Sequence, residues 1–382
     1  MFSYEEIMKK FIPVNEPLIG QREKDLVMEC LDTGWISSEG PYVKQFEEKL
    51  SKKINRKYGI SCANGSAALD IAVAALKIGP GDEVILPSFT IISCANSIVR
   101  VGAKPVVIDA DPDSWNMRTD LIEEKISSNT VAIMMVHIYG LPVDVDPILQ
   151  IAKKYNLAVI EDAAEIIGGN YKGMPCGSFG TISTFSFYPN KHITTGEGGM
   201  VFTNDSSLAE RCMMLRNLCF KKEKRFIHDE LGWNYRMTNM QAALGLAQLE
   251  KLEKTIEKKR KIGEIYNKLL GELPFIKLPL ERTSYARNIY WVYGIILGER
   301  LGKAEEFMKS LSEHGVGTRP FFYPINKQPV FKKYGFFKDC QKKLVAEDLY
   351  EQGFYIPSGL TLNREKIEYV AKQIKHLIFN LL

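Results

Sequence analysis

The sequence predicts an α/β fold, a mostly parallel β-sheet with helices on both faces, followed by a smaller α+β domain. Between residues 58 and 203 short β-rich runs alternate with helical patterns, as in parallel sheets connected by crossover helices. Residues 251–382 mix strand and helix patterns without that alternation. Because 382 residues are too many for one small core, we expect a large domain over 1–250 and a small one over 251–382.

The composition is that of an ordinary globular protein, with 45% apolar and 25% charged residues. The net charge of +4 is slight and no basic block is present, so we expect no nucleic-acid binding. The longest apolar runs, such as residues 131–136, fall far below the roughly 20 residues that span a bilayer. Residues 1–11 carry acids and lack an apolar segment, so we expect no signal peptide and no membrane association.

The cysteines and histidines argue against metal and disulfide frameworks. Seven scattered cysteines without CxxC spacing indicate reduced thiols and a cytoplasmic protein. The five histidines form no metal-ligand pair, so we expect no metal.

Along the chain, the first element is an amphipathic helix over residues 21–31, followed by a loop at 34–40 that carries Trp35. Trp35 is either a core anchor or a ligand-lining residue. A short strand from Tyr58 then leads through Asn64, Gly65 and Ser66 into an apolar helix. The free N–H groups at that helix start make an anion cradle, although Asn64 can equally be a simple N-cap.

The alternating region predicts strands at 83–86, 105–108, 131–137 and 157–160, with helices at 93–100, 119–126 and 146–154. Ligands of such sheets bind beyond the carboxyl ends of the strands. Glu161, Asp162 and Glu165 follow the last of these strands, where a carboxylate is either functional or a helix cap.

The next strand, residues 181–187, brings Ser186 and then Lys191 into a turn, before a further strand at 200–203. Thr194, Thr195 and several glycines surround this single lysine. Such a setting suits Schiff-base chemistry, in which an amine must reach an aldehyde unobstructed. With 50 Lys and Arg in the chain, an exposed lysine on a hairpin loop is the alternative.

The remainder is helical over residues 206–264, interrupted at 232–236, with one long helix expected over 237–256. A strand at 290–297, a helix at 301–314 and a last helix after Asn363 complete the small domain.

Together these pieces predict a pyridoxal phosphate (PLP) site, which needs an amine, a carboxylate at the ring nitrogen, a phosphate cup and ring walls. Lys191 provides the amine, and Asp162, at a strand end, can keep the ring nitrogen protonated. Gly65, Ser66 and Ser186 can hold the phosphate.

At these residues the chain resembles the DegT/DnrJ/StrS sugar aminotransferase family of fold-type I PLP enzymes, over about residues 12–377. The most specific stretch is 186–199, Ser-Phe-Tyr-Pro-Asn-Lys-His-Ile-Thr-Thr-Gly-Glu-Gly-Gly. The resemblance implies a seven-stranded sheet, with Lys191 as the cofactor-binding and proton-moving lysine and Asp162 at the ring nitrogen. It places Glu165 near the ring's 3-oxygen, and it sends Asn234 to the phosphate of a neighbouring subunit, which implies a homodimer with active sites at its interface.

Within the family, Glu165 and the segments 318–324 and 357–360 resemble the GDP-perosamine synthase branch. The implied activity is transfer of an amino group from glutamate to a nucleotide-linked keto-sugar, a 4-keto-6-deoxyhexose, for cell-surface polysaccharide such as O-antigen. Three departures concern the substrate: Ile91 replaces a ring-stacking aromatic, which leaves Phe89 as the expected wall, and Asn326 and Ile167 replace histidines. The expected substrate contacts are Trp35, Ser37, Tyr188, His192 and Arg319.

Three alternatives stay open. A sugar dehydratase of the same family carries His in place of Lys191, giving a His-His pair where this chain has Lys191 and His192. The retained lysine favours the aminotransferase. A PLP-binding regulator would carry an added DNA-binding module, which the sequence lacks. A UDP- or dTDP-linked sugar is the other possible acceptor.

Overall fold

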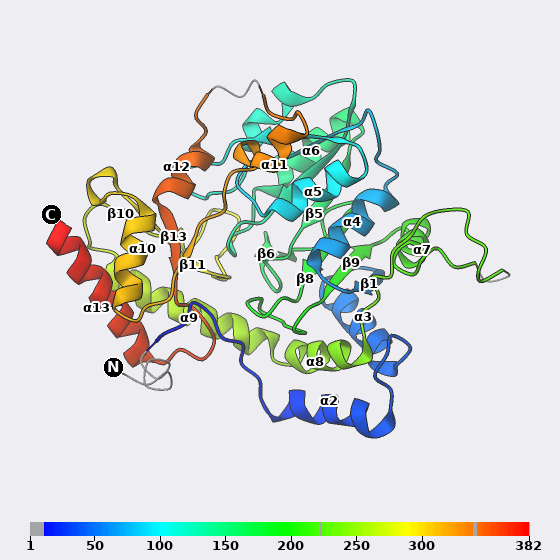
Figure 1. Cartoon of the computed structure of the whole chain (residues 1–382), viewed down its shortest axis with the longest axis horizontal. Coiled ribbons are helices and arrows are strands. Elements are labelled where there is room, and N and C mark those ends of the chain that lie inside the picture. The colour runs from blue at the N-terminus through cyan, green and yellow to red at the C-terminus, as the bar shows by residue number, and fades with distance from the viewer. Residues whose placement is uncertain (1–10, 222–223, 339–341, 382) are drawn as a thin grey trace.

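The main sheet has seven strands in the order β1-β9-β8-β5-β4-β2-β3 (Figure 1). The computed structural model describes residues 11–221, 224–338 and 342–381, so the N-terminal residues 1–10 and Cys340 lie outside the described part. The strands are β1 Tyr58–Cys62, β2 Glu83–Pro87, β3 Lys104–Ile108, β4 Thr130–Val136, β5 Ala158–Asp162, β8 Ile182–Ser186 and β9 Gly199–Thr203.

Most of this sheet is parallel, as predicted. Strands β3, β2, β4, β5 and β8 run parallel, while β9 pairs antiparallel with both β8 and β1. Asp162 of β5 lies opposite Thr184 of β8. The carboxyl ends of these two neighbouring strands therefore deliver the residues after Asp162 and after Ser186 to the same edge.

Helices cover both faces of the sheet. Side chains alternate along β2, where Val84 and Leu86 enter one apolar core and Ile85 enters the other. Helices α4 Gly65–Ala75, α5 Ile92–Arg100 and α7 Ser206–Leu215 pack on the first core. Helices α2 Gln21–Thr33, α3 Pro41–Lys53, α6 Val145–Tyr155 and α8 Asn239–Leu249 pack on the second.

Two helix predictions were wrong. Residues 119–126 form two separate 3₁₀ turns, η1 Thr119–Leu121 and η2 Glu123–Lys125, because the backbone bonds there join residues three apart, as in Lys125 N to Ile122 O at 3.0 Å. The single helix expected over 237–256 is α8 followed by α9, Leu252–Leu270. Lys251 leaves helical geometry between them, and its Nζ lies 2.7 Å from both carboxylate oxygens of the buried Glu23.

A second sheet lies beside the first, with strand order β10-β11-β13-β12 and antiparallel pairing throughout. Its strands are β10 Ile276–Lys277, β11 Tyr293–Leu297, β12 Arg319–Pro320 and β13 Gly353–Ile356. Helices α10 Ala304–Glu313, α12 Val345–Gln352 and α13 Arg364–Leu381 lie beside this sheet (Figure 1). Helix α9 joins the two parts. Its residues Leu252 and Ile256 enter the second core of the main sheet, and Ile262, Tyr266 and Leu270 enter a third apolar core, which packs on the second sheet. The domain division at 250/251 stays a prediction.

Across the described residues, no helix is long and apolar enough to cross a membrane. That same part of the chain groups no three potential metal ligands, and its six cysteines are free thiols.

Candidate active site

A cavity of about 490 Å³ opens at the carboxyl ends of β5 and β8. Its walls combine the main sheet with residues of the second sheet. The predicted site residues that line it are Gly65, Ser66, Asp162, Glu165, Ser186, Tyr188 and Lys191.

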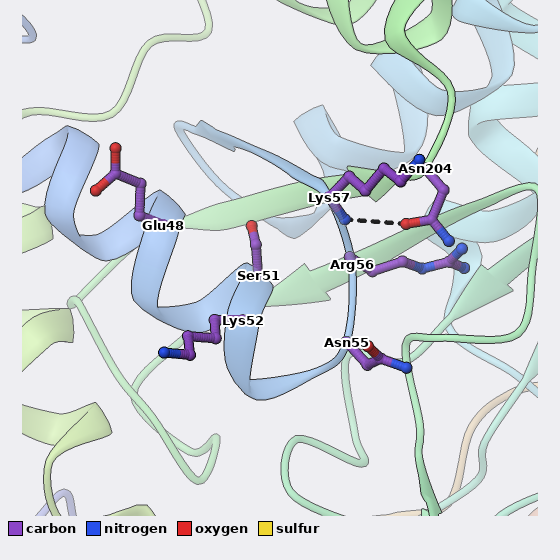
Figure 2. Close-up of a pocket in the computed structure, with 7 residues that line it drawn as sticks. All are labelled: Glu48, Ser51, Lys52, Asn55, Arg56, Lys57 and Asn204. Atoms are coloured by element: carbon purple, nitrogen blue, oxygen red, sulfur yellow. Dashed lines mark hydrogen bonds between the residues drawn. The ribbon is translucent and has the colours of Figure 1, made fainter.

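A second depression of similar volume, about 500 Å³, lies on the surface between α3, the start of β1 and Asn204 (Figure 2). Asn204 Oδ1 accepts a hydrogen bond from the Lys57 N–H at 2.9 Å there. None of the predicted site residues lines this depression. The cavity at the sheet edge is therefore the candidate site.

Lys191 follows β8 in a turn that its own backbone closes, since its N–H donates to Tyr188 O at 2.9 Å. Its Nζ lies 3.7 Å from the centroid of the Trp291 ring. Burial lowers the pKa of Lys191, although Glu165 and Asp162 act in the opposite direction. The site thus holds an amine whose neutral, nucleophilic form is more accessible than that of a surface lysine.

Two buried carboxyl groups face this amine. Asp162 ends β5, and its two oxygens accept hydrogen bonds from Ala164 N–H at 3.1 Å and from the Cys94 thiol at 3.2 Å. Burial raises the pKa of Asp162. Glu165 accepts from Tyr139 N–H at 2.9 Å, and burial raises its pKa to about 8. Glu165 therefore takes up a proton more readily than an exposed glutamate, and in its protonated form it can donate a hydrogen bond.

The start of α4 forms a polar cradle on the opposite wall. Asn64 caps the helix, with Oδ1 accepting from Ala67 N–H at 2.8 Å. A Cβ on Gly65 would lie only 2.6 Å from Ser186 Cβ, so glycine keeps this space open. The Ser66 hydroxyl lies 2.8 Å from that of Ser93. The buried Thr184 hydroxyl on the same lining has no partner within the described chain.

These groups fit PLP. The helix N-terminus, with nearby hydroxyls and an unpartnered buried Thr184, suits a phosphate group. The buried Asp162 carboxylate suits a ring N–H, and Lys191 suits an aldehyde.

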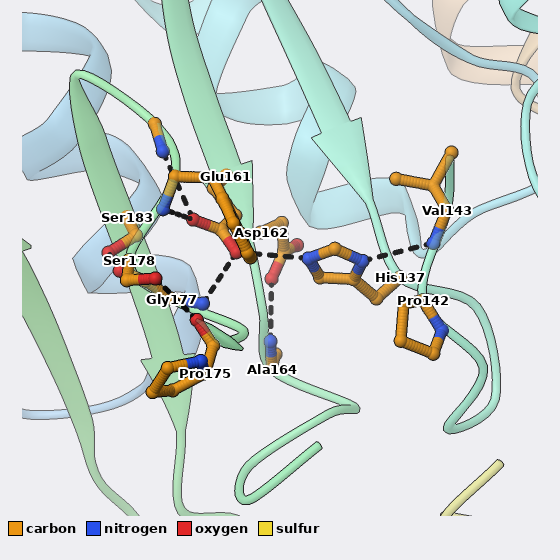
Figure 3. A network of polar contacts seen from close by, with 12 residues as sticks. His137, Pro142, Val143, Glu161, Asp162, Ala164, Pro175, Gly177, Ser178 and Ser183 are labelled. Atoms are coloured by element: carbon orange, nitrogen blue, oxygen red, sulfur yellow. Dashed lines mark hydrogen bonds and ion pairs between the residues drawn. The ribbon is translucent and has the colours of Figure 1, made fainter. Parts of the chain in front are cut away.

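A buried network holds the strand end behind Asp162 (Figure 3). Glu161 accepts from His137 Nε2 at 3.0 Å and from the N–H groups of Phe179 and Gly180 at 2.9 and 3.1 Å. His137 Nδ1 accepts from Val143 N–H at 3.2 Å, so the proton of the neutral ring lies on Nε2. Burial by itself raises the pKa of Glu161, but His137 and the backbone donors lower it overall, and the carboxylate stays ionised.

Two other predicted residues lie behind the cavity walls. Phe89 is fully buried among Tyr139, Phe321 and Phe322, with centroid distances of 5.7 to 5.9 Å, and does not line the cavity. His192 is buried with Nε2 3.2 Å from Ile289 O, and burial lowers its pKa to about 3.

The remaining four predicted residues also lie outside the lining. Arg319 is exposed on β12, opposite Tyr355, a residue that does line the cavity. Trp35 and Ser37 are exposed on the loop between α2 and α3, where their carbonyls accept hydrogen bonds from Asn239 at 2.7 Å. Asn234 is exposed, and its Oδ1 accepts from Arg236 Nε at 3.0 Å.

Sequence reasoning missed several lining residues. Trp291, Phe322 and Tyr355 come from the second sheet and its connections, 100 or more residues after Lys191, where an apolar strand pattern indicates only a core. Ser93, which lines the cavity, and Cys94, which donates to Asp162 from behind the lining, lie in the first turn of α5, where a helix beginning beyond the carboxyl end of β2 was the available signal.

Comparisons with known proteins show which proteins this chain is similar to. GDP-perosamine synthase from Escherichia coli O157:H7 is 43% identical over 96% of this chain and 98% of its own length. GDP-perosamine synthase from Caulobacter vibrioides is 42% identical with the same coverage. A Streptococcus pneumoniae protein assigned as a sugar aminotransferase, solved in PLP and PMP forms, has a TM-score of 0.90 at 25% identity. Its PLP form is covered over 100% of its chain and 97% of this one.

The DegT/DnrJ/EryC1/StrS aminotransferase family model matches residues 17–375. This match spans the main sheet, the cavity and the second sheet. The predicted resemblance, the enzyme class and the PLP cofactor are thereby confirmed. The chain belongs to the DegT/DnrJ/EryC1/StrS aminotransferase family and is a PLP-dependent aminotransferase.

Proposed function

We propose that this aminotransferase moves an amino group from glutamate to a GDP-linked 4-keto-6-deoxyhexose. The observation that carries the chemistry is that Lys191, Asp162 and Glu165 line one cavity beside the α4 cradle. The identity of 43% and 42% to GDP-perosamine synthases over nearly the whole chain supports the sugar and the nucleotide.

In this proposal PLP, when bound, supplies an electron sink for the bonds broken at the amino-bearing carbon. Asp162 holds the ring N–H, while Gly65, Ser66, Ser186 and Thr184 hold the phosphate. Glu165, as a neutral acid, donates to the ring's 3-oxygen. Lys191 Nζ moves the proton between cofactor and substrate carbons, a general acid/base role typically worth ~10²–10⁴ in rate.

The rim of the cavity supports a nucleotide-linked acceptor. Tyr188 lines the cavity with 49% of its surface exposed, and Arg319 lies in register with Tyr355 on the neighbouring strand. An aromatic face on the lining and a guanidinium on the strand beside it suit a base and a diphosphate. We also propose Trp35, Ser37 and His192 as substrate contacts. Because none of them lines the cavity of the single chain, they would reach the substrate after a rearrangement of the site or across the interface with a second subunit.

A homodimer forms part of this proposal. Phe226, Ile227 and Leu231, in the segment before Asn234, are 80%, 56% and 93% exposed, which is unusual for large apolar side chains on a free surface. A partner subunit would cover them and bring Asn234 to the partner's phosphate cradle.

The dimer can be tested by complementation. Asn234→Ala and Lys191→Ala chains are inactive alone under this proposal, but mixing them should restore activity at the site that has both an intact Lys191 and the partner's intact Asn234. If Asn234 acts within its own chain, the Asn234→Ala chain carries the whole defect of its own site and mixing restores nothing.

We place the enzyme in the cytoplasm, in the synthesis of cell-surface polysaccharide precursors. The six free thiols of the described chain suit a reducing compartment.

The substrate is tested by incubating the PLP-loaded enzyme with glutamate and GDP-, UDP- or dTDP-linked 4-keto-6-deoxyhexoses. The expected result is equal amounts of 2-oxoglutarate and an amino-sugar from the GDP-linked compound, measured by mass spectrometry. Turnover of only a UDP- or dTDP-linked compound would refute the nucleotide. Release of ammonia with a deoxygenated keto-sugar would instead place the chain with the dehydratases.

A further inference from the structure

Lys259, on α9, is a buried lysine whose hydrogen-bond partners in the described chain include no carboxylate. Its Nζ donates to Trp291 O at 2.9 Å and to Ser358 O at 2.6 Å, with Ser358 Oγ at 3.5 Å. Burial lowers the pKa of Lys259 to about 7. A buried lysine without an ion pair is costly, so these contacts of α9 with the residues just before β11 and just after β13 call for an explanation.

The residue that Lys259 holds, Trp291, contacts the Lys191 segment twice. Its indole Nε1 donates to Asn190 O at 2.9 Å, and its ring centroid lies 3.7 Å from Lys191 Nζ. Phe322 stacks against the Trp291 ring, with a centroid distance of 6.4 Å and an interplanar angle of 23°. The Trp291 side chain therefore bonds to the backbone before Lys191 and also contacts the Lys191 amine.

We infer that Trp291 is the resting place of the Lys191 ammonium whenever Lys191 is not bonded to the cofactor, and that Lys259 holds Trp291 there. Both are positioning residues for the proton-moving step. The inference rests on the proposed role of Lys191, but not on the identity of the sugar or nucleotide.

The physical basis is the charge distribution around the amine. Glu165 and Asp162 face Lys191 from the cavity lining, the Cys94 thiol lies near them, and the buried His192 is the next residue in the chain. The negative face of an indole ring favours an ammonium over a neutral amine. Trp291 therefore opposes the lowering of the Lys191 pKa by burial. Lys191 can then hold a proton between taking it from one carbon and giving it to the other.

The test uses the full-length chain without cofactor, in which Lys191 is free. Trace acetylation with acetic anhydride at a series of pH values, read by peptide mass spectrometry, gives the titration midpoint of each lysine. We expect Trp291→Leu to lower the Lys191 midpoint by about one pH unit, because an ammonium over a desolvated ring loses its π contact. Trp291→Phe keeps an aromatic face and should stay close to wild type.

Trp115→Leu is the matched control, since Trp115 is equally buried and contacts Tyr139 and Phe321 but lines no part of the cavity. Its Lys191 midpoint should be that of wild type. A folded Trp291→Leu chain with an unchanged Lys191 midpoint would overturn the inference. A shift of the same size in Trp115→Leu would show that any loss of core volume has this effect and would overturn it too.

Lys259→Met separates two roles and remains informative if Trp291→Leu does not fold. If Lys259 acts by holding Trp291, its loss lowers the Lys191 midpoint in the same direction as Trp291→Leu. If Lys259 acts only as a nearby positive charge, its loss raises that midpoint, and its positioning role is refuted.

Discussion

The thiol of Cys94 donates a hydrogen bond to the Asp162 carboxylate, with Sγ 3.2 Å from Oδ2. This donor lowers the pKa of Asp162 against the larger effect of burial, which raises it. Cys94→Ala should therefore leave Asp162 less ionised and less able to hold the ring N–H. A single net hydrogen bond is worth about 1 kcal/mol, so we expect the half-reaction with glutamate to slow roughly 5-fold in stopped-flow measurements. Cys212→Ala, at a buried cysteine that does not bond to Asp162, should react at the wild-type rate. Equal rates for both variants would show that the Cys94 contact has no role.

Gly65→Ala tests the phosphate cradle. The added Cβ would lie 2.6 Å from Ser186 Cβ and 2.9 Å from its hydroxyl, so it must displace a group of the cradle. We expect PLP affinity to fall at least tenfold in equilibrium dialysis. Gly79→Ala is the matched control, because a Cβ there meets only Val101 O at 3.9 Å, and its PLP affinity should not change. Wild-type PLP affinity in Gly65→Ala would show that the phosphate does not bind at this cradle.

Glu161→Gln should destabilise the fold, although Glu161 does not line the cavity. The carboxylate accepts charge-assisted bonds from His137 and from backbone N–H groups, and losing its charge should cost about 3 kcal/mol of unfolding free energy. Because its folded pKa lies below the unfolded value of 4.5, this stabilisation is present above pH 4.5 and is lost as the pH falls further. Urea unfolding at pH 7 and pH 4 measures both effects. Glu123→Gln, an exposed partner of Lys154, should leave the midpoint unchanged, and the same midpoint in Glu161→Gln would refute the prediction.

His192 should make the fold sensitive to mild acid. Burial lowers its folded pKa to about 3, so between that value and 6.5 the unfolded chain binds a proton that the folded chain does not. The contribution of His192 to stability therefore falls as the pH drops below 6.5, by up to about 1.4 kcal/mol per pH unit, whereas Glu165, with its pKa raised to about 8, contributes the opposite slope between pH 8 and 4.5. His192→Gln should remove the His192 contribution, so between pH 6.5 and 4.5, above the range in which Glu161 acts, the variant should lose less stability on acidification than the wild type. His228→Gln, at an exposed position, should retain the wild-type slope, and an unaltered slope in His192→Gln would contradict the assignment.

Lys191→His should separate cofactor binding from amination. Imidazole can move protons but cannot bond to the aldehyde, so the variant should bind pyridoxamine phosphate without a covalent link and release no steady 2-oxoglutarate. Borohydride treatment of the PLP-loaded wild type should place the pyridoxyl group on Lys191, as shown by peptide mapping. A label on Lys172 or Lys221 would refute the site. Lys172→His is the control and should retain activity, since Lys172 is exposed and paired with Asp146.

The sequence allowed the sheet and one wall of the cavity to be predicted, because both depend on local patterns. Asp162 and Ser186 end neighbouring strands, and Gly65 begins a helix, so strand ends and helix starts located these residues. The opposite wall could not be predicted in this way. Trp291 and Tyr355 belong to β-rich apolar runs of the second sheet, where a core side chain and a cavity side chain give the same pattern.

Phe89 shows the same limit of prediction from sequence, because it was expected to wall the cofactor ring but does not line the cavity. Its place in the chain, two residues before Ile91, suggested a ring wall, but contacts with Tyr139 and Phe322 hold it beneath the surface of the cavity. Such contacts join residues far apart in the sequence, and a single chain carries no local signal for them.

The continuous helix α9 has a mechanical consequence for access to the cavity. Its 19 residues span about 28 Å as one rod, with its first turns in a core of the main sheet and its later turns in the core of the second. If the second sheet swung outward about this connection, α9 would have to bend, or one of its ends would lose its packing. We therefore expect substrate entry and product release to depend on loops at the rim of the cavity and not on a hinge opening between the two sheets.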